Sequence, residues 1–254
     1  MSEPRPLPAL SLVMPCYNEE EVLPFTLPRL LRAFRAAGIE LELVACDNGS
    51  HDRTGEILRE FAAKDPHVVP FRVEVNQGYG NGVLRAIPAC TAPWIGIIPA
   101  DGQVDADDVV RLFESVRDAR SPVLGKVFRR FRMDGPVRAV VSFLYNVFLH
   151  LLWPGVTTFD VNGSPKILHR DTVRAMELKS GDWLLDPEIV IKAHLMGLPT
   201  LELNTFARMR EHGASHVKAG TAWEFFHRLL GYRLGQELSA WRQRAVGAKS
   251  ASAH

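Results

Sequence analysis

Acidic and amide side chains follow the apolar runs in the first half of the chain, and these residue types can bind a nucleotide. Carboxylates accept hydrogen bonds from a base or a ribose, and an aspartate with an amide oxygen can hold a divalent metal. Asp, Asn and Gly also dominate turns, so any one group is explained equally well as a turn or a helix cap. Several groups at one edge of a sheet favour a nucleotide site. They are Pro15, Cys16, Tyr17, Asn18 and Glu19 after the first run, Asp47, Asn48, Gly49, Ser50 and Asp52 after the second, and Asp101, Gly102 and Gln103 after the fourth.

The elements that must position these side chains are short apolar strands alternating with segments of helical period. The strands are predicted at residues 10–14, 41–46, 68–75 and 94–98. The first helix has apolar residues at helical spacing from Leu23 to Phe34, and Pro24 and Pro28 are expected to delay or kink its start. The later helices are predicted to begin at Asp52 or Thr54, near Gly78 and at Asp105. This alternation predicts an α/β fold whose mostly parallel sheet is flanked by helices. Ligands bind such sheets beyond the carboxyl ends of the strands, where the acidic and amide groups lie.

Positive charge is concentrated after the fourth predicted helix. This segment contains one acid, Asp134, and the cations Lys126, Arg129, Arg130, Arg132 and Arg138. These cations could hold a donor diphosphate, an acceptor phosphate or anionic lipid headgroups. A solvated loop is the alternative interpretation.

The longest apolar stretch follows, over residues 139–156, and Ser142, Asn146, His150 and Pro154 interrupt it. About 20 clean apolar residues are needed to cross a bilayer, so the stretch does not predict a transmembrane helix. It could lie along a membrane interface, where a lipid-phosphate acceptor would be presented. The alternative is that these residues belong to the core.

The rest of the chain predicts two further strands and a helical end. Residues 159–168 and 199–206 have the strand pattern. Residues 221–244 predict an amphipathic helix, which could contact a membrane, a homodimer partner or the catalytic domain. The small and polar residues 245–254 predict a disordered tail. The expected organisation is therefore one catalytic domain over residues 8–220, a C-terminal helix and the tail.

Composition restricts the classes of function. The chain has 254 residues, 46% hydrophobic and 23% charged, which fits one domain with a sizeable core. Its 30 basic and 29 acidic residues give no overall field, so no nucleic-acid partner is expected. Cys16, Cys46 and Cys90 are predicted to be buried as small apolar side chains. The start of the chain has no signal-peptide pattern, which predicts a cytoplasmic protein, with contact at the inner face of the membrane left open.

The order of the motifs resembles that of family 2 glycosyltransferases. The first half contains V-M-P-C-Y-N-E-E, D-N-G-S-H-D-R-T, N-Q-G-Y-G-N-G and P-A-D-G-Q. The second half contains R-A-V-V-S-F-L-Y-N, then Asp160 ahead of N-G-S-P-K, then L-D-P-E and R-E-H-G-A-S-H. This order is similar to the dolichyl- and polyprenyl-phosphate mannose synthases of that family and extends over residues 10–220. The resemblance implies a Rossmann-like GT-A catalytic domain with a C-terminal helical tail.

The resemblance also implies roles for individual residues. Asp101 and Gln103 would bind Mg²⁺ or Mn²⁺, which would bridge the donor diphosphate. Nucleotide-sugar binding would fall to Pro15, Tyr17, Asn18, Glu19, Asp47, Gly49, Gly82, Asp101 and Lys126. The acceptor or its phosphate would be bound by Arg129, Arg138, Ser142, Arg210, Ser215 and His216. The catalytic carboxylates would be Asp186, Asp160 and Glu188.

The implied reaction is inverting transfer of a hexose from a nucleoside-diphosphate sugar. Asp186 is the candidate general base, although a phosphate acceptor is already ionised and needs one less than a hydroxyl does. The donor stays open between GDP-mannose and a UDP-hexose. The acceptor is expected to be a polyprenyl phosphate, with a soluble small molecule as one alternative and a non-catalytic nucleotide-binding protein as another. Pro99 stands where similar enzymes usually have a further metal-site aspartate, Lys126 and Val127 replace the last two residues of a G-S-R motif, and His216 stands where lysine is common.

Overall fold

The structure is a computed structural model and describes residues 6–131, 136–206 and 220–251. Strands and helices alternate through the first half, as the sequence predicts. The strands there are β1 (Leu10–Cys16), β2 (Leu41–Asn48), β3 (Val68–Val73) and β4 (Trp94–Ile97). The helices are α1 (Leu23–Ala36), α2 (Thr54–Lys64), α3 (Tyr79–Ala86), the short 3-10 turn η1 (Ile87–Ala89) and α4 (Ala106–Arg117).

The second half departs further from the expected elements. The basic segment begins as a strand, because Lys126 and Arg129 lie in β5 (Leu124–Phe131). The strand expected over residues 159–168 is confined to β6 (Lys166–His169). The other elements are α5 (Pro136–Leu152), α6 (Arg170–Met176), α7 (Leu185–Leu195), β7 (Thr200–Phe206), α8 (Gly220–Leu234) and α9 (Gln236–Ala251).

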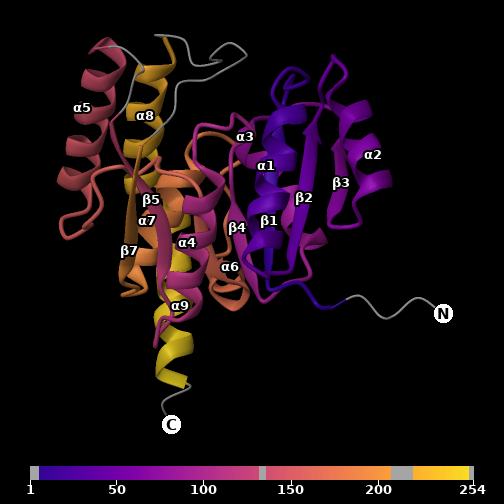
Figure 1. The fold of residues 1–254 in the computed structure, drawn as a ribbon. Coiled ribbons are helices and arrows are strands. Elements are labelled where there is room, and N and C mark those ends of the chain that lie inside the picture. Colours follow the sequence, from indigo (N-terminus) through magenta and orange to yellow (C-terminus); the bar gives the residue numbers. More distant parts are fainter. Residues whose placement is uncertain (1–5, 132–135, 207–219, 252–254) are drawn as a thin grey trace.

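All strands join one seven-stranded sheet in the order β3-β2-β1-β4-β6-β5-β7 (Figure 1). β1 pairs in parallel with β2 and β4, β2 with β3, and β5 with β7. β6 is antiparallel to both of its neighbours, β4 and β5. Its amino end therefore lies at the edge where the other strands have their carboxyl ends, and Lys166, the first residue of β6, reaches that edge.

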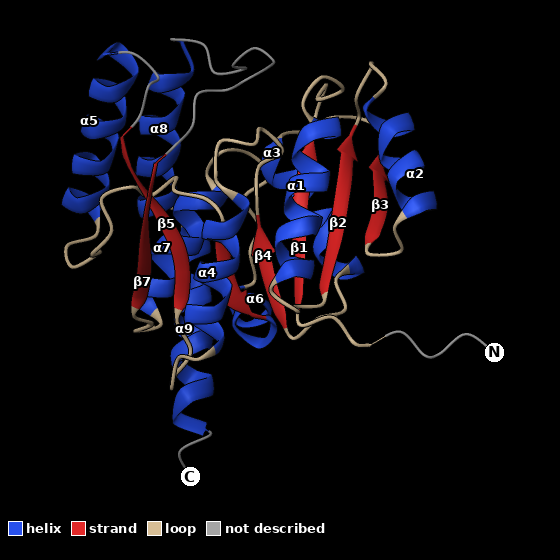
Figure 2. Ribbon diagram, in the orientation of Figure 1, coloured by secondary structure: helices blue, strands red, loops and turns tan. Residues whose placement is uncertain are grey.

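The sheet separates two hydrophobic clusters, which the alternation of side chains along each strand produces. Leu12 and Met14 of β1 pack into one cluster with α1, α2 and α4. Val13 packs into the other, with residues of α3 and of helices α5 to α9. Figure 2 shows helices on both faces of the sheet, which confirms the predicted α/β fold with a mostly parallel sheet.

The C-terminal helices belong to the core of the catalytic domain. Leu229 and Tyr232 of α8 and Leu238 and Trp241 of α9 are buried in the same cluster as β1 and α7. The indole of Trp241 donates to the carbonyl oxygen of Ala175 at 3.0 Å. α9 continues to Ala251, into the segment that the sequence predicts as a disordered tail.

Membrane crossing is not supported by any helix in the three described ranges, since each is too short or too polar to span a bilayer. Most of the apolar stretch of residues 139–156 lies in α5.

Candidate functional site

The loop after β1 is tied to the loop after β2 by side-chain hydrogen bonds. The backbone N–H of Asn18 donates to Ser50 Oγ at 3.1 Å, and that of Glu19 donates to Thr54 Oγ1 at 2.8 Å. Asn18 adopts a left-handed backbone (φ 54°), and its Oδ1 accepts from the N–H of His51 at 2.9 Å. The structure thus brings together the first two motifs that the sequence assigns to the nucleoside.

Asp47 lies at the end of β2, and only 3% of the residue is exposed. Its Oδ1 accepts from the backbone N–H of Ser50 at 2.9 Å, and its Oδ2 pairs with Arg72 Nη1 at 2.7 Å. The Arg72 side chain is 46% exposed, so this partner can move away from Asp47 at small cost. A nucleoside that uses the Asp47 carboxylate must compete with Arg72.

Gly49 and Gly82 have local packing reasons to be glycine. A Cβ at Gly49 (φ 74°) would lie 2.7 Å from the backbone N of Asn76, and a Cβ at Gly82 would lie 2.8 Å from Cγ of Asn48. The close approach of α3 to the end of β2 therefore depends on Gly82. Both glycines shape the nucleotide edge, and their contact with a donor stays a prediction.

Asp101 and Gln103 lie in the loop between β4 and α4, beyond the carboxyl end of β4. The backbone N–H of Gln103 donates to Asp101 Oδ1 at 3.1 Å, with the left-handed Gly102 (φ 65°) between them. A carboxylate and an amide, both oxygen donors, suit Mg²⁺ or Mn²⁺. Within the described ranges, three or more His, Cys, Asp or Glu residues nowhere converge as a metal site. A metal at this loop would need further oxygen ligands, which a diphosphate supplies.

Arg129 binds Asp160 and also feels the negative charges of Asp186 and Asp101. Its guanidinium forms two hydrogen bonds with Asp160, and 15% of its side chain is exposed. Burial opposes its charge, but the hydrogen bond to Asp160 and the negative charges of Asp160, Asp186 and Asp101 outweigh burial and raise the pKa of Arg129. These carboxylates, which come from distant motifs, are therefore gathered around one arginine.

Lys126 is fully buried beside that group. Its Nζ donates to Thr158 Oγ1 at 3.0 Å, to Glu202 Oε1 at 3.0 Å and to a backbone carbonyl at 3.1 Å. Burial and the charge of Lys166 lower the pKa of Lys126, against the opposing pull of Asp160 and Glu202. With these partners in place, Lys126 reaches a donor diphosphate only if it is released from Glu202.

The two acidic residues of the L-D-P-E motif have different surroundings at the start of α7. Asp186 pairs with Lys166 Nζ at 2.5 Å. Glu188 is fully buried, pairs with Lys192 Nζ at 2.6 Å and accepts from the backbone N–H groups of Lys179 and Ser180. Glu188 therefore holds the loop before α7, and none of these contacts links it to the other carboxylates. No role for Lys166 was predicted from the sequence, although Lys166 is the last residue of the N-G-S-P-K motif.

A contact between the first turn of α3 and the loop before α7 joins the nucleotide edge to α7, and it was not predicted from the sequence. The rings of Tyr79 and Trp183 stack with centroids 5.2 Å apart and planes 8° apart. The N–H of Asn81 donates to the carbonyl of Gly181 at 2.7 Å, and a Cβ at Gly80 would lie 2.2 Å from the carbonyl oxygen of Ser180. Burial and the charges of Asp186 and Asp101 raise the pKa of the Tyr79 hydroxyl.

The acceptor residues are only partly visible. On α5, the Asn146 side chain donates to the carbonyl of Ser142 at 2.7 Å and accepts from the N–H of Val161 at 3.1 Å, which fixes the chain next to Asp160. The Arg138 side chain and the residues Arg210, Ser215 and His216 lie outside what the structure describes.

The outer side of α5 is apolar and exposed. Its most exposed large side chains are Val140, Phe143, Leu144 and Leu151, at 56%, 65%, 50% and 72%, and Phe159 in the following loop is 64% exposed. Figure 1 shows α5 beside α8 at one end of the molecule, and the two helices are in contact. Exposed apolar clusters of this kind mark sites that bind membranes or other proteins.

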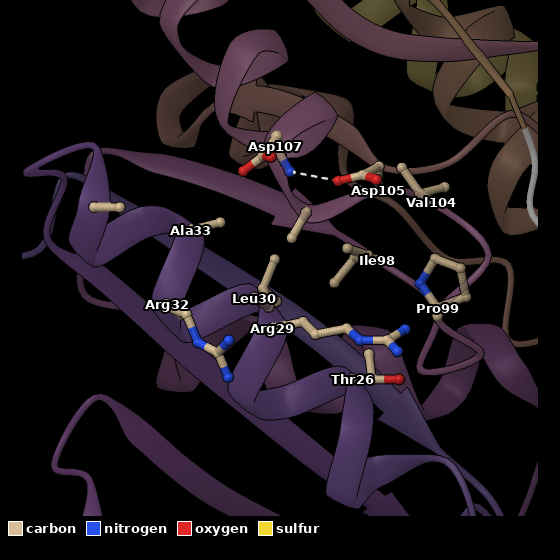
Figure 3. A pocket seen from close by; sticks show the side chains of 13 residues that line it. Thr26, Arg29, Leu30, Arg32, Ala33, Ile98, Pro99, Val104, Asp105 and Asp107 are labelled. Atoms are coloured by element: carbon tan, nitrogen blue, oxygen red, sulfur yellow. Dashed lines mark hydrogen bonds between the residues drawn. The ribbon is translucent and has the colours of Figure 1, made fainter.

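A cavity of about 340 Å³ lies apart from these groups, between α1 and the loop that leads to α4 (Figure 3). Thr26, Arg29 and Leu30 of α1 line one side, and Pro99 and Asp105 line the other. Its lining includes Gly102 but neither Asp47, Asp101 nor Asp186. It therefore lies behind the Asp101 loop and does not coincide with the candidate site.

Comparisons with known proteins agree with the motif order and the fold. The chain is 30% identical over 208 residues to the undecaprenyl-phosphate 4-deoxy-4-formamido-L-arabinose transferase of Pectobacterium atrosepticum, a match that covers 81% of this chain and 62% of that protein. It is 26% identical over 211 residues to the dolichyl-phosphate beta-glucosyltransferase of Dictyostelium discoideum, covering 76% of this chain and 64% of that one. The chain thus spans less than two thirds of both relatives.

The fold is similar to that of glucosyl-3-phosphoglycerate synthase from Mycobacterium tuberculosis, solved with Mn²⁺, UDP and glucosyl-3-phosphoglycerate. The TM-score is 0.70 at 19% identity, over 89% of this chain and 80% of that one. This confirms the expected GT-A fold. A family model described as Glycosyl transferase family 2 matches residues 11–175. On these grounds the chain belongs to glycosyl transferase family 2.

Proposed function

We propose that this chain transfers a hexose from a nucleoside-diphosphate sugar to a polyprenyl phosphate, with inversion at the anomeric carbon. The observation that carries the proposal is Arg129, which binds Asp160 through two hydrogen bonds and feels the charges of Asp101 and Asp186, at the sheet edge where the motif loops meet. The names of the relatives, one acting on undecaprenyl phosphate and one on dolichyl phosphate, support the acceptor class.

The donor is held by the loops that follow β1 and β2. Tyr17 and Glu19 lie in the first loop and Asp47 lies at the end of β2, just before the second loop, and the hydrogen bonds between the loops hold them together before a donor arrives. Preorganised loops of this kind reduce the entropy lost on binding. The fold neighbour was solved with UDP, so a UDP-hexose is the first donor to test, with GDP-mannose as the alternative.

A divalent metal is part of the proposal, and the residues present fit one. Asp101 and Gln103 would hold Mg²⁺ or Mn²⁺ together with oxygens of the diphosphate, and fold neighbours were solved with each of these ions. When bound, the metal neutralises the charge that develops on the leaving diphosphate. Similar enzymes usually have a second metal-site aspartate at position 99, but this chain has proline there. The proposal therefore requires only one carboxylate of this loop, that of Asp101.

The reaction is a displacement at the anomeric carbon. An oxygen of the acceptor phosphate forms the new bond to this carbon, and the bond from the carbon to the diphosphate oxygen breaks, so the nucleoside diphosphate leaves with the electron pair. The acceptor phosphate carries its own negative charge, which reduces the need for a general base. Asp186 and Asp160 orient the hexose and acceptor, and Arg129 places positive charge between these carboxylates and Asp101.

The acceptor is proposed to reach the site from a membrane surface. The exposed apolar residues of α5 and Phe159 lie on elements that flank Asp160, so a bilayer in contact with them would present a lipid phosphate near the carboxylates. Peripheral contact needs only such a surface and no membrane-spanning segment.

The deciding experiment measures transfer from radiolabelled UDP-glucose, UDP-N-acetylglucosamine or GDP-mannose to undecaprenyl phosphate in detergent, with Mn²⁺, Mg²⁺ or EDTA. We expect a metal-dependent lipid-linked sugar with one donor. Asp101→Ala protein serves as the inactive control. Transfer to 3-phosphoglycerate but not to the lipid would replace the acceptor class, and tight binding of UDP or GDP without any transfer would contradict the enzymatic proposal.

A further inference from the structure

Lys166 and Asp186 form a buried ion pair that links the reversed strand to α7. The Nζ of Lys166 lies 2.5 Å from Asp186 Oδ1 and 3.0 Å from the carbonyl oxygen of Gly163. Lys166 is 1% exposed and Asp186 is 7% exposed. The pair exists because β6 runs antiparallel to its neighbours, which brings its first residue to the edge where the motif carboxylates lie.

Burial of the Lys166 ammonium group costs free energy that a structural role alone does not explain. It lies directly opposite Lys126 on β5, so two buried ammonium groups are cross-strand neighbours. Burial lowers the pKa of Lys166, while the charge and hydrogen bond of Asp186 oppose that change. Like charges side by side destabilise a sheet unless each has its own partner. Here Lys126 pairs with Glu202 at 3.0 Å and Lys166 pairs with Asp186.

The groups that face Asp186 come from several elements, and they leave part of its carboxylate available. The charge of Asp186 acts on Arg129 of β5, Tyr79 of α3 and Tyr145 of α5, as well as on Lys166 of β6. Arg129 already donates hydrogen bonds to Asp160 from both Nε and Nη2. Within the described part of the chain, the hydrogen bond to the Asp186 carboxylate is made by Lys166 to Oδ1.

We propose that Lys166 is the positioning residue of the reaction centre: it fixes Oδ1 of Asp186 and so directs Oδ2 to the acceptor or the hexose. This inference rests on the proposed function. A carboxylate held through one oxygen cannot rotate freely, and small errors in the placement of a reacting or orienting group reduce rates strongly.

The test compares Lys166→Met, Lys166→Arg, Asp186→Asn and the double variant Lys166→Met/Asp186→Asn in the transfer assay with UDP-glucose or whichever donor the wild type uses. We expect Lys166→Met to lower kcat by about 100-fold while KM for the donor changes little. The thermal shift that the donor produces should stay close to that of the wild type, because the lysine acts on the geometry of the reacting groups and not on donor binding. The double variant should be no slower than Asp186→Asn alone, because the lysine acts through that carboxylate.

A matched control is Lys192→Met, which removes the lysine of the other buried pair, Glu188–Lys192. It should lower Tm and leave kcat much closer to the wild-type value than Lys166→Met does. Lys166→Arg keeps a positively charged donor beside Asp186, so we expect it to recover part of the kcat that Lys166→Met loses, although the guanidinium does not fit the same space.

Some results would overturn the inference. A folded Lys166→Met protein with wild-type kcat would contradict it, and so would losses in the double variant that multiply those of the single variants. If Lys166→Met does not fold, the double variant, which leaves no unpaired buried carboxylate, and Lys166→Arg still decide the question. A wild type that transfers no hexose to any acceptor contradicts the proposed function together with this inference, whereas an active wild type with an unaffected Lys166→Met variant contradicts this inference alone.

Discussion

Arg129 and Asp160 form a bidentate ion pair with two parallel hydrogen bonds, from Nε to Oδ2 at 2.9 Å and from Nη2 to Oδ1 at 2.8 Å. The backbone N–H of Arg129 donates to the same carboxylate at 3.1 Å. Such a fork-to-fork pair fixes the planes of both groups. The pair therefore couples β5 to the segment before β6 and orders the charged centre of the site in advance of any substrate.

Removal of Arg129 should destabilise the protein as well as inactivate it. In Arg129→Met the Asp160 carboxylate, 7% exposed, would lose both guanidinium hydrogen bonds, and breaking a buried pair costs about 3–5 kcal/mol. Urea unfolding measures the loss. Arg129→Met/Asp160→Asn should recover much of the stability and none of the activity. Equal stability of the wild type and Arg129→Met would show that the pair is not formed in solution.

Asp101 should carry the metal dependence of the reaction. We expect Asp101→Asn to reduce kcat by about 100-fold or more, since charge stabilisation of the leaving diphosphate is lost. The thermal shift that UDP produces in the presence of Mn²⁺ should shrink in the same variant, because the ligand then binds the native state less tightly. An Asp101→Asn protein that retained the full Mn²⁺-dependent shift would remove this residue from the metal site.

Gly80 should not tolerate a side chain. In Gly80→Ala the new Cβ would lie 2.2 Å from the carbonyl oxygen of Ser180, so the loop before α7 must move away from α3. We expect a loss of about 1–3 kcal/mol of stability and lower transfer activity. The matched control is Gly231→Ala in α8, where nothing lies within 4 Å of the new Cβ. It should be neutral or gain up to about 1 kcal/mol. Thermal unfolding measures both variants, and equal Tm values for Gly80→Ala and Gly231→Ala would contradict the prediction.

The apolar face of α5 should bind lipid. Phe143→Ser/Leu151→Ser replaces two side chains that are 65% and 72% exposed, so stability should be retained while sedimentation with anionic phospholipid vesicles decreases. Leu7→Ser, at a position 89% exposed near the start of β1, is the control and should sediment as the wild type does. If the double variant instead changed from dimer to monomer by light scattering, the face would be a protein interface.

The cysteines should be unreactive in the folded protein. Burial raises the pKa of Cys46 and that of Cys90 to about 12, and raises the pKa of Cys16 well above 9.0. Because these folded-state values lie above the unfolded value, the associated stability is complete below about pH 9 and is lost as the pH rises towards 12. At pH 8 a thiol reagent should label the three cysteines only after guanidinium is added. Fast labelling of the native protein would show that one thiol is accessible.

Local pattern was sufficient for the first half of the chain. The strands of β1, β2 and β4 and the helices after them follow from periodicities of about two and 3.6 residues, which need no knowledge of distant contacts. The groups after these strands could be assigned to one sheet edge for the same reason, because parallel strands end on one side.

Tertiary structure alone decided how the second half completes the site. The antiparallel direction of β6 brings Lys166 to Asp186, twenty residues further along the chain, and no local periodicity encodes strand direction. Asp186 and Glu188 are two residues apart in one motif, and helix geometry turns them to different sides. Asp186 lies among the carboxylates around Arg129. Glu188 pairs with Lys192 and anchors the loop before α7. The sequence by itself determined the chemistry available to this protein, and long-range packing determined which of those groups meet.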